Sequence, residues 1–373
     1  MFKLNKTSKK SQARLGVLTT ARGKVSTPFF MPIATKAAIK SLTVQDVQDL
    51  GAEIILSNTY HNYLRPGLEV IKKHGDLHDF MDCDLPILTD SGGYQVFSLS
   101  KLRKIKGDDI EFQSHIDGKT YILNPKRVID IQKVLGSDIM MVLDECVGLP
   151  TTRAEAEMAL ERTTRWAKIA FDYKHRLNQK SAKIKKQLMF GIVQGADFKD
   201  LRLRSLEELL ALENKTAHWD GLAVGGLAVG EPTKVMYQVL DDLVFKMPEN
   251  RPRYLMGVGY PENIVEAVKR GVDMFDCVIP TREARHGKLY LWKGKPDPTK
   301  KDFYQTINIS NAKFASDKKS INNSNLKNYS LSYLHHLFKT QEPLALRLAT
   351  LNNLNFYLEL MSEIRKAIKS GKL

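Results

Sequence analysis

Short apolar runs alternate with amphipathic stretches from Pro28 to Pro280. Eight such runs occur, and most are followed by a segment with helical periodicity, such as LTVQDVQDLG or PENIVEAVKRG. Short continuous apolar runs separated by helical segments indicate parallel strands that are covered by helices. Eight of them predict an α/β fold of the (β/α)8 TIM-barrel type rather than an open sheet. The runs are 28–34, 52–60, 85–93, 137–145, 187–195, 219–227, 251–259 and 272–280.

Two segments interrupt this rhythm. Residues 98–125 alternate between polar and apolar positions around an Asp-Gly turn, which predicts an inserted β-hairpin. After the eighth run comes a span rich in Asn, Ser and Lys, followed by a long periodic stretch that we expect to be the closing helix of the barrel. The predicted parts are a basic N-terminal arm with the barrel strands and helices (1–280), an appended basic subdomain (281–345) and the closing helix (346–373).

The charge is concentrated at the two ends of the chain. The net charge is +15, with seven Lys and Arg and no acid in residues 1–24, and seventeen Lys and Arg against seven acids in residues 281–373. The body between them has a net charge of −2. Such asymmetry favours a polyanionic partner, of which nucleic acid is the usual one, over a generally basic solvated surface.

The composition is that of a globular protein that does not enter a membrane. Hydrophobic residues make up 43% of the chain, no run approaches the roughly 18 apolar residues of a membrane span, and the basic N-terminus lacks the apolar core of a signal peptide. Cys83, Cys146 and Cys277 are far apart and form no CxxC pair. We therefore expect a cytoplasmic protein without a disulfide framework or a cysteine zinc site.

Polar residues follow several of the predicted strands. In a barrel, the residues just past the strands converge on one mouth, where the chemistry lies. Each of these residues taken singly can also be a strand-end cap or turn residue. At the end of the fourth run, either Asp144 or the adjacent Glu145 can be the residue that faces the mouth. The set is Asn58, Asp90, Asp144, Gln194, Gly226, Met256 and Asp276.

The last predicted strand places an acid beside a cluster of cations. Asp276 stands near the end of an apolar run, Pro280 stops that run, and Arg282, Arg285 and His286 follow. Burying a charge is costly unless the charge is paired or used. Two aspartates can divide a displacement at a sugar carbon between a nucleophile and an acid or base.

A third acid with nearby amide groups suits the edge of a heterocycle. A carboxylate accepts from ring N–H and amino donors, whereas amide and backbone N–H groups donate to a carbonyl oxygen, and guanine offers that pattern. Met256 and Tyr94 can sandwich the faces of such a base, although core packing is an equal alternative for Tyr94 and the favoured one for Met256.

At these residues the chain resembles the bacterial tRNA-guanine transglycosylases, the queuine tRNA-ribosyltransferase family. The resemblance covers nearly the whole length and is carried by SNTYH, LTDSGGYQVFSLS, LDEC, GIVQG, GGLAVGE, YLMGVG, GVDMFDCVIPTR and YLHHL. It implies exchange of the wobble guanine in tRNAs with GUN anticodons (Asp, Asn, His and Tyr isoacceptors) for a 7-deazaguanine, without ATP. It also implies a homodimer.

The resemblance assigns a role to each residue of the constellation. Asp276 is the nucleophile that forms a covalent intermediate with the tRNA ribose, and Asp90 is the general acid/base. The residues implied to recognise, line or stack on the base are Asp144, Gln194, Gly226, Leu227, Ser91, Asn58, Tyr94 and Met256.

The same resemblance bears on the RNA and on the choice of base. Arg282 and Arg285 correspond to anticodon-contacting arginines, and His286 stands where bacterial members usually have Asn. Val229 and Cys146 match the bacterial pattern, which implies a preference for the small 7-aminomethyl-7-deazaguanine over queuine.

One departure from the family is large. Members normally hold a structural zinc through CxCxxC and a later histidine, but the corresponding positions here are Ile321, Asn323, Leu326 and Asn352. Tetrahedral zinc needs four good N, S or O ligands. We therefore expect no zinc and no other cofactor, with apolar and amide packing in its place.

Two other classes of function compete with the transglycosylase. A non-catalytic tRNA-binding paralogue would be expected to lack the nucleophile or the base, and Asp90 and Asp276 are both present. A metal-dependent barrel hydrolase would need histidine clusters at the strand ends, and the sequence has none there.

Overall fold

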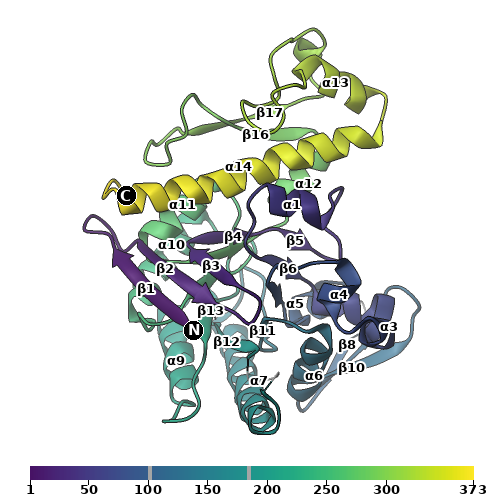
Figure 1. The fold of residues 1–373 in the computed structure, drawn as a ribbon. Helices are drawn as coiled ribbons and strands as arrows, with labels where there is room; N and C mark the ends of the chain where they lie inside the picture. Colours follow the sequence, from purple (N-terminus) through teal and green to yellow (C-terminus); the bar gives the residue numbers. More distant parts are fainter. Residues whose placement is uncertain (100–102, 183–185) are drawn as a thin grey trace.

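A closed parallel barrel forms the centre of the molecule (Figure 1). The computed structural model describes residues 1–99, 103–182 and 186–373. The barrel strands are β4 (Phe29–Met31), β5 (Ile33–Ala34), β6 (Ile55–Ser57), β7 (Ile87–Thr89), β11 (Ile139–Met141), β12 (Leu188–Val193), β13 (Gly221–Val224), β14 (Arg253–Leu255) and β15 (Met274–Asp276). Because β4 and β5 are two halves of one strand, pairing with β15 and β6 respectively, the eight-stranded barrel closes. The predicted (β/α)8 barrel is confirmed.

Helices cover the outside of the barrel. Nearly all residues of the barrel strands are buried, as expected for strands covered on both faces. Two helices begin at capping boxes, which are formed by Thr43 with Asp46 and by Thr152 with Glu155. The helices are α1 (Val44–Asp49), α2 (Thr59–Asn62), α3 (Leu68–His74), α4 (Leu77–Met81), α5 (Gly93–Leu99), α6 (Pro125–Leu135), α7 (Arg153–Lys180), α9 (Lys199–Leu210), α10 (Thr233–Leu243) and α11 (Pro261–Lys269). None of the described helices is both long and apolar enough to cross a membrane.

The N-terminal segment is a folded sheet rather than an arm. Strands β1 (Phe2–Thr7), β2 (Arg14–Thr19) and β3 (Lys24–Thr27) pair in sequence order. Arg14 forms a buried ion pair with Asp273, its Nε lying 2.9 Å from Oδ1, just before β15 begins. The sheet therefore lies at the end of the barrel where the strands start, away from the strand ends that carry the predicted site. Its positive charge does not add to that site.

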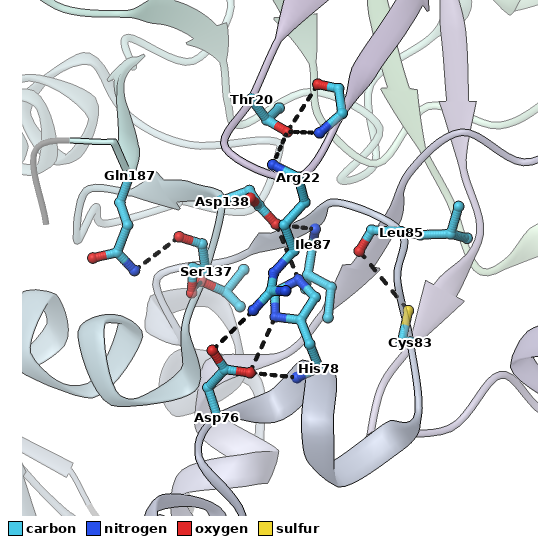
Figure 2. A network of polar contacts seen from close by, with 12 residues as sticks. Thr20, Arg22, Asp76, His78, Cys83, Leu85, Ile87, Ser137, Asp138 and Gln187 are labelled. Atoms are coloured by element: carbon cyan, nitrogen blue, oxygen red, sulfur yellow. Dashed lines mark hydrogen bonds and ion pairs between the residues drawn. The ribbon is translucent and has the colours of Figure 1, made fainter. Parts of the chain in front are cut away.

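A buried ionic network also occupies this end of the barrel (Figure 2). His78 of α4 lies between two carboxylates, with Nε2 3.0 Å from Asp138 Oδ2 and Nδ1 3.4 Å from Asp76 Oδ1. Arg22 Nη2 contacts Asp76 at 3.0 Å, and Asp138 also accepts from the Ile87 N–H at the start of β7. Burial opposes the charged form of His78, but the two carboxylates raise its pKa above the usual value. The network ties α4 and β2–β3 to the barrel.

The insertion after the third barrel strand is larger than a hairpin. Strands β8 (Arg103–Lys106), β9 (Asp109–Gln113) and β10 (Thr120–Leu123) form a three-stranded antiparallel sheet. The predicted Asp117-Gly118 turn joins the last two, and a second turn at Gly107 adds the first. Residues 100–102 of the predicted hairpin lie outside the described residues. The Tyr60 hydroxyl lies 2.9 Å from His115 Nδ1, which brings the insertion to the side of the barrel where β6 ends.

The C-terminal part follows β15 and has a core of its own. It comprises α12 (Ile279–Arg285), β16 (Lys288–Trp292), β17 (Tyr304–Asn308), α13 (Leu331–Lys339) and α14 (Pro343–Lys369). Helix α14 lies between this subdomain and the barrel (Figure 1). Its first turns join the subdomain core through Leu348, and Tyr357 packs on Phe30 of β4 with ring centroids 5.0 Å apart. One helix thus serves both units, beginning three residues before the predicted boundary.

Candidate active site

Asp276 ends the last barrel strand with a fixed side chain. Its Oδ1 accepts hydrogen bonds from the Tyr254 hydroxyl at 2.6 Å and from the Gly257 N–H at 2.8 Å. Gly257 has φ +73°, a backbone conformation that favours glycine. Burial raises the pKa of Asp276, and these two hydrogen bonds oppose the rise. The carboxylate is oriented and partly desolvated, which suits a nucleophile.

Asp90 follows β7 and is held by three donors. The Thr59 N–H donates to Oδ1 at 2.8 Å, Gln95 Nε2 donates to Oδ2 at 2.9 Å, and the Asn58 amide also donates to Oδ2. Burial raises the pKa of Asp90 to about 6 despite these bonds. The negative charge of Asp276 makes a smaller contribution in the same direction, and both carboxylates stand at the carboxyl ends of barrel strands.

Asp144 is the central residue of a second polar group at the same mouth. Its Oδ1 accepts from Ser91 Oγ at 3.2 Å, and its Oδ2 accepts from Gln194 Nε2 at 2.8 Å. Burial raises the pKa of Asp144 to about 6, with a smaller contribution from the Glu145 charge. The structure thus brings together side chains from the ends of β7, β11 and β12.

The choice between Asp144 and its neighbour is settled by their partners. Asp144 is 6% exposed and belongs to this polar group. Glu145 pairs with Arg162 of α7, and its N–H donates to Thr163 Oγ1 at 3.0 Å. Glu145 therefore faces α7.

Gly225 and Gly226 bring main chain against the Gln194 side chain. A Cβ on Gly226 would lie 2.5 Å from Gln194 Oε1, and one on Gly225 would lie 2.7 Å from Gln194 Nε2. A side chain at either position would therefore displace Gln194. Leu227, next in the loop, is 3% exposed.

The two proposed stacking residues differ in their surroundings. Met256 is partly buried against the barrel core. Tyr94 on α5 is 56% exposed, and it lines a cavity of about 530 Å³ together with Cys146 and Arg162. Glu145, which directly follows Asp144 in the chain, also lines this cavity.

Arg282 and Arg285 both lie on α12, which begins just after the strand that carries Asp276. Arg282 is exposed, whereas Arg285 is partly buried and donates to the Thr281 carbonyl at 3.0 Å. Burial and the charge of Arg282 both lower the pKa of Arg285. His286, which ends the helix, is exposed.

Several supporting residues escaped the sequence reasoning. Tyr254 lies inside an apolar run, Gly257 in the turn after it, and Gln95 in the GYQVF stretch, so none marks the end of a strand. The inward direction of Tyr254 follows from strand alternation, but its hydrogen bond to Asp276 depends on the neighbouring strand. Such partners emerge only from the paired geometry.

Fold and site together define a (β/α)8-barrel enzyme whose mouth holds two electrostatically coupled carboxylates and a separate group that combines an acid with an amide. Comparison with known proteins identifies the family. The family model described as queuine tRNA-ribosyltransferase matches residues 8–373. The chain belongs to this family, and its predicted membership is confirmed.

Curated relatives match over nearly their full length. The queuine tRNA-ribosyltransferase of Desulforamulus reducens is 47% identical over 376 residues, covering all of this chain and 95% of the relative. That of Dictyoglomus turgidum is 47% identical over 377 residues and is covered to 92%. That of Thermoanaerobacter sp. (strain X514) is 45% identical over 376 residues and is covered to 94%.

Proposed function

We propose that this chain is a tRNA-guanine transglycosylase that exchanges the wobble guanine of GUN-anticodon tRNAs for 7-aminomethyl-7-deazaguanine. The observation that carries the proposal is the pair Asp90 and Asp276, oriented by separate donors and coupled by charge at one barrel mouth. Full-length identity to queuine tRNA-ribosyltransferases supports the substrate class. A tRNA substrate supports a cytoplasmic location.

The reaction proceeds by two displacements at the ribose anomeric carbon. An Asp276 oxygen attacks that carbon, the bond to guanine N9 breaks, and protonated Asp90 gives its proton to the departing base. The incoming base then yields its N9 proton to Asp90, and N9 displaces Asp276 from the ribose. Because the glycosidic bond energy is kept in the covalent ester, no ATP is needed.

The second polar group recognises the base. Asp144 accepts from the ring N–H and amino group, while Gln194 and the Gly226 and Leu227 N–H groups donate to the carbonyl oxygen. Ser91, already bonded to Asp144, orients that carboxylate. Asn58 donates to Asp90, which favours a role in holding the acid/base rather than the base edge.

Two residues near the recognition loop support the smaller base. Cys146 is partly exposed beside the Tyr94 cavity, and Val229 lies in the loop after β13, where its N–H donates to Glu231 at 3.0 Å. Their side chains limit the space for a bulky 7-substituent. The position of Arg282 and Arg285 on the helix after Asp276 supports a role in contacting the anticodon phosphates.

The appended subdomain does not suit zinc. Ile321 and Leu326 are 1% and 3% exposed within its apolar core, Asn323 is exposed, and Asn352 is buried. Two aliphatic and two amide side chains do not fit a metal that takes thiolate, imidazole or carboxylate ligands. We propose that the subdomain is held together without a metal.

Asparagines make the cross-links there. Asn322 Nδ2 donates to Asn352 Oδ1 at 3.1 Å, and Asn322 Oδ1 accepts from the Leu326 N–H at 3.0 Å. Asn352 Nδ2 in turn donates to the Tyr290 carbonyl at 3.1 Å. These bonds join the 321–326 loop to α14 and β16.

We also propose a homodimer. Tyr329 and Tyr333 of the subdomain are 38% and 40% exposed and stack with ring centroids 6.1 Å apart. A pair of exposed aromatic rings is typical of protein interfaces. The second copy of the chain is the partner that the family resemblance suggests.

The assay for the function is base exchange. Purified protein is expected to incorporate labelled guanine into an unmodified GUN-anticodon tRNA without ATP, and excess 7-aminomethyl-7-deazaguanine is expected to suppress the incorporation. A tRNA with a different wobble base is the control. No incorporation at stoichiometric enzyme, with tRNA binding intact, would favour the non-catalytic paralogue.

The metal-free subdomain has its own test. Elemental analysis of protein purified without chelators is expected to show no stoichiometric zinc, and EDTA is expected to leave the melting temperature and exchange activity unchanged. Chelators unfold domains whose folding depends on zinc. One zinc per chain, or a lower melting temperature in EDTA, would contradict the proposal.

A further inference from the structure

Arg202 is a buried cation behind the proposed base site. It lies in the first turn of α9, is 1% exposed, and donates four hydrogen bonds to main-chain carbonyls. Its Nε bonds to Ala196 O at 2.8 Å, and its Nη1 bonds to Val193 O at 2.9 Å and Gly225 O at 2.6 Å. Its Nη2 bonds to Gly226 O at 3.2 Å. Burial lowers the pKa of Arg202 to about 10, and the carbonyl dipoles compensate the charge.

These carbonyls lie at the end of β12 and in two loops at the mouth of the barrel. The first loop follows β12 and contains Gln194, and the second follows β13 and contains the glycine pair. Ala196 has a φ of +52°, a left-handed conformation that a residue other than glycine keeps only when its surroundings hold it, whereas Gly226 adopts its φ of +63° without strain. The Arg202 guanidinium holds the Ala196 carbonyl and the carbonyls of the glycine pair at once.

The hydrogen bonds from Arg202 to the Gly225 and Gly226 carbonyls determine where the next two backbone N–H groups point. In a planar trans peptide the C=O and the following N–H point to opposite sides. Because Arg202 takes the carbonyls of Gly225 and Gly226, the N–H groups of Gly226 and Leu227 point away from Arg202. The Gly226 N–H accordingly faces the Cys146 thiol, so the base oxygen replaces this contact when it binds that donor. Burial raises the pKa of the thiol to about 12, and the hydrogen bond from Gly226 opposes the rise.

We infer that Arg202 is a positioning residue for base specificity. It aims the Gly226 and Leu227 N–H groups at the 6-oxo oxygen of the base without touching the base. The inference rests on the proposed function, and in it Arg202 keeps the base-binding N–H groups in the direction that recognition of the base requires. A lysine cannot replace it, because one ammonium does not span four carbonyls in two loops as a planar guanidinium does.

The test compares two arginines of the same helix. Arg202→Lys is expected to raise KM for guanine by roughly tenfold or more and to change kcat less, because a poorly aimed donor weakens base binding. Arg204→Lys is the matched control. Arg204 is partly exposed and pairs with Glu157, Glu161 and Glu208, so its replacement is expected to leave KM within about twofold.

A second measurement separates aiming from general support. The inhibition constants of 7-deazaguanine and of 2-amino-7-deazapurine, which lacks the 6-oxo group, are measured for the wild type and for Arg202→Lys. Wild type is expected to prefer the 6-oxo base, and Arg202→Lys is expected to reduce that preference roughly tenfold. Equal weakening of both inhibitors, or an unchanged KM in a folded variant, would overturn the inference.

A structure of the wild type with guanine bound gives an independent answer if the lysine variant does not fold. O6 is expected within hydrogen-bond distance of the Gly226 and Leu227 N–H groups, with Arg202 on the two carbonyls. O6 on other donors would refute the inference. Failure of the wild type to exchange guanine would instead refute the proposed function, so the two failures are distinguishable.

Discussion

Asp276→Asn is expected to abolish the denaturation-resistant complex between the protein and tRNA. The asparagine Oδ1 can still accept from the Tyr254 hydroxyl and the Gly257 N–H, so the fold and the side-chain position are retained. A neutral amide oxygen is a poor nucleophile for the anomeric carbon. Exchange is therefore expected to fall by on the order of 10⁴-fold or more, the scale seen when a nucleophile is removed.

The measurement is a denaturing gel of protein mixed with labelled tRNA, together with equilibrium binding of the same tRNA. Binding is expected to change little, because the anticodon contacts proposed for Arg282 and Arg285 do not depend on the carboxylate. Asp302→Asn is a matched control, since Asp302 is an exposed acid paired with Lys293 far from the barrel mouth. An adduct that persists in Asp276→Asn would assign the nucleophile to another residue, of which Asp90 is the nearest candidate.

The barrel could be predicted from the sequence because its strands are buried on both faces. Continuous apolar runs such as 187–195, repeated eight times between helical segments, favour a closed parallel sheet, and that topology places the residue after each run at the barrel mouth. The main site residues followed for the same reason. The predicted N-terminal arm, by contrast, is a sheet. It could not be predicted because the alternating pattern in 14–19 is short and the basic residues of this segment are typical of a solvent-exposed chain.

The supporting contacts could not be predicted in the same way. Arg202 in DLRLRS has the same local sequence character as Arg204, yet one is buried under two loops and the other is paired at the surface. The difference depends on where the loop after β13 lies, which no local pattern encodes. The three donors on Asp90 likewise come from two separate elements, the strand end at Asn58 and the helix that carries Gln95.

Asp90→Asn is the second change with a large expected effect. Asp90 transfers a proton to and from base N9, a role worth roughly 10²- to 10⁴-fold in rate. Both half-reactions use this proton, so adduct formation and base incorporation are expected to slow together. The asparagine keeps its oxygen toward the Thr59 N–H, and its NH2 then faces the Asn58 and Gln95 amides, both of which can flip to present their oxygens; Gln95 Oε1 has no hydrogen-bond partner among the described contacts.

The pH profile tests the same role independently. A base that takes a proton must be ionised, and burial raises the pKa of Asp90 to about 6. In wild type, kcat/KM for the incoming base is therefore expected to rise as pH increases through about 6 and to level off above it. In the covalent intermediate that binds the incoming base, Asp276 is an ester without charge, so this limb reports Asp90 alone. In Asp90→Asn the surviving rate is expected to lose the limb near pH 6, because no carboxylate remains there to accept the N9 proton. A variant that keeps both the wild-type rate within about threefold and the limb would remove Asp90 from proton transfer, leaving the hydrogen bonds from Asn58, Thr59 and Gln95 as its only role.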